Sequence, residues 1–218
     1  MNKEWSELNK TMQAQIKKKD TYKMGIDTLF NLRRQLMQTL VSFKEDLCRE
    51  DFNAIPFINA DGYHSKTIAY SIWHIFRIED IVAHTVITED EQVFFTGNYQ
   101  VRINSPIITT GNELVKQQIA DFSKQLNLEE LYSYIFEVRE STEKILERFS
   151  YDELKWKIPD ERKGYLKSLN VVNCDEKAIW LIDYWCNKDI CGLIQMPFSR
   201  HWIMHTEACL RIKNKMHS

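Results

Sequence analysis

Two histidines near the carboxyl end of the chain, His201 and His205, are four residues apart. In a helix each residue advances about 100° around the axis, so the two imidazole rings would lie one above the other on a single face. Two rings at this spacing can reach one metal ion, at about 2.0–2.1 Å from each nitrogen. Ala208 and Ile212 continue the same face, which indicates that it points into the protein. From spacing alone, the pair predicts either part of an interior metal site or two core histidines held by hydrogen bonds.

A third histidine, His74, lies within a segment whose apolar periodicity predicts a helix over residues 65–88. The polar residues of this segment share one face of the helical wheel, which we expect to be solvated: Lys66, Arg77, Asp80 and His84. His74 lies outside that face, so its ring is predicted to turn inward. A third histidine from another helix would complete a site of three nitrogen ligands with the HxxxH pair, with a fourth position left open for water or substrate.

Several better-known catalytic patterns do not fit the sequence. A zincin needs a glutamate directly after the first histidine of the pair, and Trp202 stands there instead. A di-iron bundle needs Glu-x-x-His, which the sequence lacks. Neither a Ser-His-Asp order nor a glycine-rich phosphate loop is evident, and Glu207 points about 200° away from His205 around the helix. The histidines therefore have no obvious general base beside them.

One acidic residue, Glu79, falls on the apolar arc of the 65–88 helix. A buried carboxylate is costly without a partner, so Glu79 should either orient a ligand histidine or pair with an arginine such as Arg33 or Arg200. An ordinary buried ion pair is the favoured interpretation. Glu79 and Arg200 are thus the residues that we expect just outside the ligand set.

Composition and periodicity predict an all-α protein. The 218 residues include only 6 glycines and 4 prolines, which favours long helices with few turns. Residues 3–19 carry an amphipathic stripe, predicted to form a short helix packed onto the main body. Long helices are expected over 22–48, 65–88, 128–149 and 199–215, and shorter ones over 112–126 and 176–191. Residues 51–62 and 96–111 contain glycine or proline and should be irregular, and residues 150–174 should form a long connection with room for a short helix or an extended pair.

The charge balance and the cysteines limit the partners and the compartment. The net charge is −2, so we expect neither a nucleic acid nor an anionic membrane as partner. No apolar run approaches the roughly 20 residues that span a bilayer, and the first residues are polar. The cysteine count is 5, an odd number, and no CxxC pair occurs. We therefore expect a cytoplasmic protein with reduced thiols.

The segments SIWHIFRIEDIVAHTVI and MPFSRHWIMHTEACLRI together resemble the DinB-like (YfiT-like) superfamily of bacterial four-helix bundles. Its members have one histidine in the second helix, an HxxxH pair in the last and a divalent metal ion between them. His74, His201 and His205 match these positions, and the similarity covers roughly residues 20–215. The resemblance implies one bundle domain over 1–218, with 1–20 as an N-terminal extension. The long 89–127 and 150–174 segments depart from smaller members.

The resemblance also implies a class of activity. The metal ion would be Zn²⁺ or Ni²⁺, and relatives act as metal-dependent hydrolases or as bacillithiol or mycothiol S-transferases on small-molecule substrates. We favour transfer of a low-molecular-weight thiol, because a general base is not evident. The alternative is a non-catalytic stress-response or binding module with a structural or vacant metal site, for which Glu79 would be the nearest fourth ligand. Such bundles often pair, so a homodimer is a further expectation.

Overall fold

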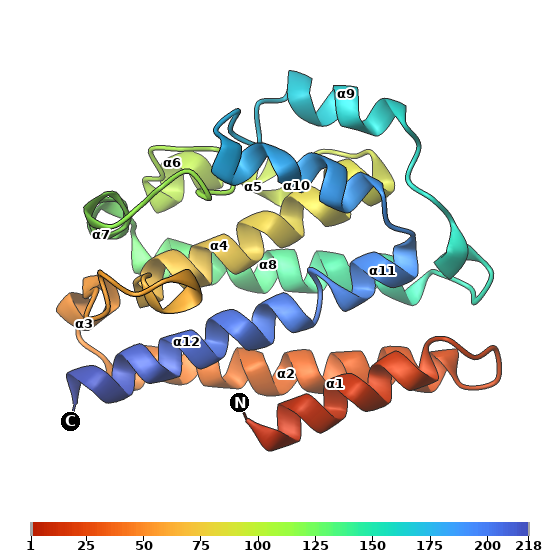
Figure 1. Ribbon diagram of the computed structural model, residues 1–218, viewed down its shortest axis with the longest axis horizontal. Helices are drawn as coiled ribbons and strands as arrows, with labels where there is room; N and C mark the ends of the chain where they lie inside the picture. The colour runs from red at the N-terminus through yellow and green to blue at the C-terminus, as the bar shows by residue number, and fades with distance from the viewer. Residues whose placement is uncertain (1, 218) are drawn as a thin grey trace.

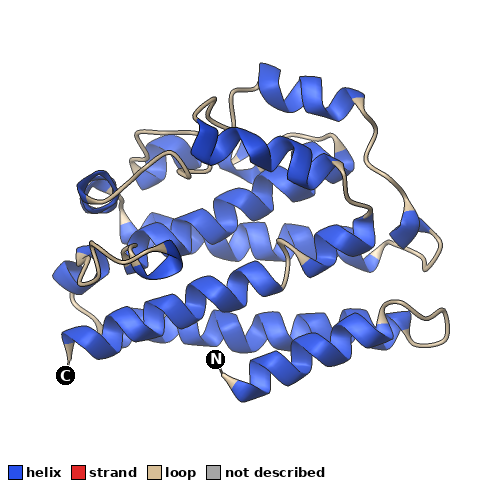
Figure 2. Ribbon diagram, viewed as in Figure 1, coloured by secondary structure: helices blue, strands red, loops and turns tan. Residues whose placement is uncertain are grey.

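The computed structural model describes residues 2–217, and every regular element in that range is helical (Figures 1 and 2). Within the described part, the sole β-type pairing is an isolated bridge between Lys157 and Asp189. The predicted all-α class is confirmed. No helix among the described residues is long and apolar enough to cross a bilayer.

The helices follow one another along the chain as follows. They are α1 (Lys3–Gln15), α2 (Tyr22–Asp46), α3 (Arg49–Asn53), η1 (Gly62–His64), α4 (Ile68–Asp80), η2 (Ile81–Thr88), α5 (Val93–Thr96), α6 (Tyr99–Ile103), α7 (Gln117–Gln125), α8 (Leu128–Glu147), η3 (Glu153–Lys155), α9 (Glu161–Ser168), α10 (Glu176–Cys186), α11 (Ile190–Gln195) and α12 (Arg200–Met216). Most are α-helices; η1 and η3 are 3₁₀ turns and η2 is a π-helix.

Four of the longer helices contact one another in a closed ring. α2 packs against α8 and α12, and α4 packs against the same two helices from the other side. α1 lies along α2, as Figure 1 shows, and buries Trp5 and Met12 there, in agreement with the predicted apolar stripe. Burying such stripes against one another is the main source of stability in helical proteins.

Local sequence signals explain where several of these helices begin. The side chain of Asn127 accepts hydrogen bonds from the backbone N–H groups of Glu129 and Glu130 at the start of α8. The Thr67 hydroxyl accepts from the N–H of Tyr70 at the start of α4, which is the helix that carries His74. These side chains satisfy N–H groups that the first helical turn leaves without a partner.

The structure contradicts the predicted solvated face of the 65–88 helix. Arg77 and Asp80 are both fully buried, and His84 is only 6% exposed. The helical-wheel prediction of a solvated face was wrong because α4 has neighbours on all sides. The helices that contact it are α3, α5, α7, α8 and α12. A helix enclosed in this way must bury its polar residues too, and they then need internal partners.

The ends of some predicted elements also differ. The expected single helix over 65–88 is α-helical only to Asp80 and continues as the π-helix η2. The helix expected over 176–191 ends at Cys186, because the Asp189 side chain accepts from the N–H of Gly192 and starts α11 instead. The segment expected to be irregular over 96–111 contains the short helix α6.

Candidate metal centre

The rings of His74, His201 and His205 meet between α4 and α12. The ring centroids are 5.1 Å apart for His74 and His201, 4.9 Å for His74 and His205, and 4.6 Å for His201 and His205. One nitrogen from each ring lies within 4.8 Å of the other two, and all three side chains are buried. The structure therefore brings together the three histidines that the sequence singled out.

A backbone carbonyl fixes the orientation of His74. Its Nδ1 lies 2.6 Å from the carbonyl oxygen of Thr110, which can only accept a hydrogen bond. Nδ1 must therefore carry the proton, and Nε2 keeps a free lone pair. Tyr70 stacks on the same ring at 5.3 Å, and its hydroxyl donates to the carbonyl of Gly111. The 110–111 backbone thus holds both His74 and the tyrosine packed on it.

The ring nitrogens of the HxxxH pair are not satisfied in this way. Nδ1 of His201 and Nδ1 of His205 are buried and have no hydrogen-bond partner. A buried polar atom left without a partner costs about 1–3 kcal/mol, so proteins seldom leave such atoms unused. No hydrogen bond to Nδ1 thus holds either ring as a structural core residue, which favours a role as cation ligands.

Burial keeps the rings neutral. It lowers the pKa of His74 to about 4, despite the opposing hydrogen bond to Thr110. Burial also lowers the pKa of His201 and of His205 well below the ordinary value, and the neighbouring histidines lower both further. Unprotonated imidazoles are the form that binds metal.

The spacing of the rings also fits an ion of the Zn²⁺ or Ni²⁺ type. Three nitrogens around a tetrahedral ion at about 2.0–2.1 Å lie about 3.4 Å from one another. The candidate nitrogens already lie within 4.8 Å, so modest rotations of the rings close the difference. Nitrogen donors without a carboxylate favour these ions over Mg²⁺ or Ca²⁺.

Glu79 forms the buried ion pair that was the favoured interpretation. Its carboxylate accepts from Arg33 at 2.7 and 2.9 Å and from the indole N–H of Trp202 at 2.7 Å. Arg33 also donates to the carbonyl of Phe198, just before α12 begins. Glu79 therefore does not contact a candidate ligand; it ties α2 and α4 to the beginning of the helix that carries His201 and His205.

Arg200 takes a different place from Glu79. It is exposed at the start of α12 and lines a surface groove together with Glu207, and it does not line the pocket that opens onto the rings. Of the two residues expected next to the ligands, only Glu79 is connected to their helices through buried contacts.

A pocket of about 270 Å³ opens onto the rings of His74, His201 and His205. Its remaining walls come from α10, α4, the 196–197 segment, Tyr63 and Asn112. Tyr63 packs edge-on against the ring of His205, with centroids 4.8 Å apart. Local sequence patterns do not point to Tyr63, Asn112, Trp180, Leu181 or Tyr184, since their segments reach this pocket only through long-range folding.

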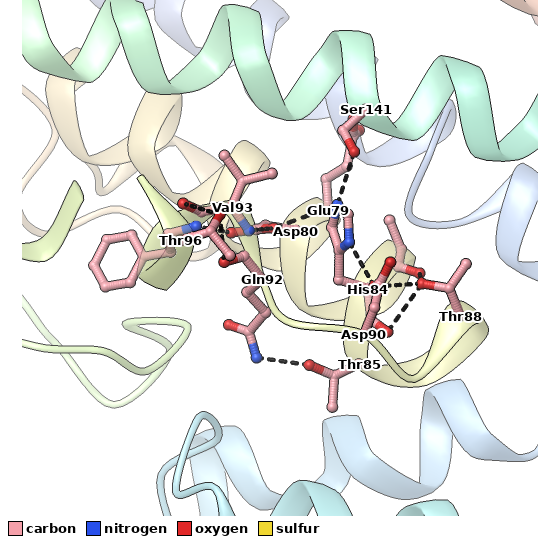
Figure 3. A network of polar contacts seen from close by, with 12 residues as sticks. Glu79, Asp80, His84, Thr85, Thr88, Asp90, Gln92, Val93, Thr96 and Ser141 are labelled. Atoms are coloured by element: carbon pink, nitrogen blue, oxygen red, sulfur yellow. Dashed lines mark hydrogen bonds and ion pairs between the residues drawn. The ribbon is translucent and has the colours of Figure 1, made fainter. Parts of the chain in front are cut away.

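His84 is the histidine whose environment was predicted wrongly. Its Nδ1 lies 2.6 Å from a carboxylate oxygen of Asp90, and its Nε2 lies 3.0 Å from the hydroxyl of Ser141 (Figure 3). Asp80 lies beside it and accepts from the backbone N–H groups of Val93 and Phe94. This network connects the π-helix η2 to α8 and to residues 90–94, which follow η2.

The hydrogen bonds of His84 to Ser141 and to Asp90 match those of a Ser-His-Asp triad, but the position of the serine argues against catalysis. Ser141 lies in the interior of α8, where backbone N–H groups are engaged within the helix. An acyl-transfer site needs such donors free to stabilise an oxyanion. We therefore interpret these contacts as structural.

The arrangement as a whole is a set of buried, neutral imidazoles at the base of a pocket, with two ring nitrogens unpartnered. It can hold a divalent cation and leave a coordination position facing the pocket. Neither a protein-family model nor a curated protein matches the chain, so the case for its function depends on this geometry.

Proposed function

We propose that this chain is a divalent-metal-binding protein of the DinB-like four-helix-bundle type. The bundle would consist of α2, α4, α8 and α12, which contact one another in a ring. Zn²⁺ or Ni²⁺ would bind to His74 from the second of these helices and to His201 and His205 from the last. The order of these residues along the chain is the one that the family resemblance implies.

The unpartnered Nδ1 atoms of His201 and His205 are the observation that carries the proposal. In a purely structural role, buried histidines find hydrogen-bond partners, as His84 does with Asp90 and Ser141. His74 has a partner on one nitrogen only, which leaves the other for coordination. A cation would satisfy the three rings at once.

The chemistry that fits best is transfer of a thiol to an electrophile. A divalent ion bound here supplies Lewis acidity, which lowers the pKa of a thiol or of water. In the transfer, the S–H proton leaves to solvent and the sulfur forms a bond to an electrophilic carbon. The bond from that carbon to its leaving group then breaks, and the electron pair departs with the group.

The pocket residues support transfer over hydrolysis. The pocket-lining residues that the structure describes include no aspartate or glutamate that could serve as general base for water. A thiolate needs no such base at the moment of attack. The residues of this chain would instead orient the reactants: Thr110 holds His74, and the walls enclose the substrate.

A non-catalytic module with a closed site is the alternative. A closed site needs a fourth protein ligand, and Glu79 was the nearest candidate in the sequence. The Glu79 carboxylate is already occupied by Arg33 and Trp202. The cluster of candidate ligands among the described residues contains only the three histidines, which favours an open position.

Metal content tests the proposal directly. Purified protein, incubated with Zn²⁺ or Ni²⁺ and then desalted, should retain about one equivalent by elemental analysis. The double variant His201→Ala/His205→Ala should retain almost none, whereas His217→Ala, which alters an exposed histidine just after α12, should match the wild type. Wild-type protein as poor in metal as the double variant would refute the proposal.

A further inference from the structure

The α10 helix presents a row of large apolar side chains to the pocket above the three histidines. Trp180, Leu181, Tyr184 and Trp185 all line it, at positions that share one face of a helix. The indole of Trp180 packs against the ring of Tyr184, with centroids 5.5 Å apart. Trp185 is almost fully buried, while Trp180 is 49% exposed at the outer edge. One wall of the pocket is therefore aromatic over its whole depth.

The rest of the lining is also largely apolar, and its described residues carry no charged side chain. Ile78 of α4 and the Met196–Pro197 segment line the pocket as well. Among the described residues that line it, none is a lysine, arginine, aspartate or glutamate. A charged group held against these walls, away from the proposed cation, would lose its hydration without gaining an opposite charge, which is costly. The pocket thus disfavours ligands whose body is ionic.

Besides the histidines, one buried polar atom among the described residues of the pocket lacks a hydrogen-bond partner. Oδ1 of Asn112 is buried and accepts no hydrogen bond from the protein. It is an acceptor, so a ligand group that donates a hydrogen bond would satisfy it. The polar groups available to a ligand are therefore few and lie against a mainly apolar enclosure, which is typical of small-molecule sites.

We infer that the pocket binds a small thiol whose body is uncharged and of aromatic-ring size, an inference that rests on the proposed function. The sulfur would face the imidazole cluster, and the apolar body would pack on the α10 row. The volume is sufficient, since cavities of roughly 150 Å³ already accommodate benzene and this pocket measures about 270 Å³.

The experiment uses protein loaded with Co²⁺, because a thiolate on cobalt gives a charge-transfer absorption that reports binding without any turnover. Benzyl mercaptan and 2-mercaptoethanol are titrated separately; both carry a thiol, but only the first carries an aromatic body. Burial of the ring should make benzyl mercaptan bind at least about tenfold more tightly.

A tryptophan pair supplies the matched variants. Trp180→Ala removes part of the pocket wall, whereas Trp156→Ala removes a similarly exposed indole that does not line the pocket. Trp180→Ala should weaken benzyl mercaptan binding several-fold, leaving both cobalt content and the 2-mercaptoethanol titration unchanged. Trp156→Ala should leave all three measurements unchanged.

The outcomes separate this inference from the proposed function. If the wild-type protein does not retain cobalt, the proposed function fails and the inference fails with it. If cobalt is retained but the two thiols bind equally well, or if the Trp156 and Trp180 variants behave alike, the metal site stands and the apolar thiol pocket is refuted.

Discussion

His74 and His84 lie ten residues apart on the continuous helical segment formed by α4 and η2, and both are buried. His84 has a hydrogen-bond partner on each ring nitrogen, Asp90 on one side and Ser141 on the other. His74 has one partner and faces two further histidines whose Nδ1 atoms have none. Burial alone thus does not distinguish a structural histidine from a candidate ligand; the partners of each nitrogen do.

The two regions differ in their acidic groups as well. Around His84, the carboxylates of Asp80 and Asp90 accept hydrogen bonds, and Asp80 also forms an ion pair with Arg77. Around His74 the nearest groups are imidazoles, aromatic rings and a backbone carbonyl. The charged groups of the His84 region are paired with one another, whereas the His74 region offers nitrogen atoms that a cation would bind.

The largest effect on stability should come from removing the Asp80 carboxylate, which lies in the His84 region. Its carboxylate accepts from the N–H groups of Val93 and Phe94 and from the hydroxyl of Tyr134, and it lies 3.6 Å from Arg77. Asp80→Ala leaves a buried arginine uncompensated, so the free energy of unfolding in urea should fall by about 3–5 kcal/mol. Asp90→Ala, at an exposed carboxylate, should cost about 1 kcal/mol. Equal losses would show that the network is not centred on Asp80.

Acid should destabilise the metal-free protein through the buried histidines of the His74 region. Burial lowers the folded-state pKa of His74 to about 4, whereas the unfolded chain titrates near the ordinary value of 6.5. Between these values the unfolded state binds more protons, so stability rises with pH and falls as pH drops from about 6.5 to 4. For His74 alone the loss is on the order of 3 kcal/mol.

Urea unfolding at a series of pH values, in the presence of a chelator, measures this dependence. The same series on His74→Gln removes one titrating ring and should give a shallower slope between pH 4 and 6.5. Carboxylates that titrate in this range contribute equally to both proteins and cancel in the difference. Identical slopes would mean that His74 is not held neutral in the folded state.

The sharpest contrast is in metal affinity. His74→Ala removes a ligand and should weaken Zn²⁺ binding by more than about a hundredfold, since loss of a group that merely supports a ligand already costs 10–100-fold. His84→Ala should leave the affinity unchanged within about twofold and instead lower stability by roughly 1–2 kcal/mol. Competition titration with a chromophoric chelator measures both affinities. Equal weakening by the two variants would contradict the assignment of His74.

The fold class and the HxxxH pair could be predicted from the sequence because both depend on local pattern, whereas the choice of His74 as the third ligand rested on the family resemblance. Scarce glycine and proline with three-to-four periodicity indicated helices, and the four-residue spacing of His201 and His205 places both rings on one helical face whatever surrounds it. Glu79 was recognised as a buried carboxylate that needs a partner, and Arg33 was among its named candidates.

What the sequence left undetermined depends on which elements surround a helix. A helical wheel assumes that one side of the helix faces solvent. It therefore wrongly predicted Arg77, Asp80 and His84 to be solvated, because the helix is enclosed on every side. The partners of Nδ1 of His74, the aromatic wall from α10 and the approach of Tyr63 and Asn112 join segments far apart in the chain. Helical periodicity is a property of neighbouring residues, whereas a pocket forms where distant segments pack, and only the tertiary structure decides that.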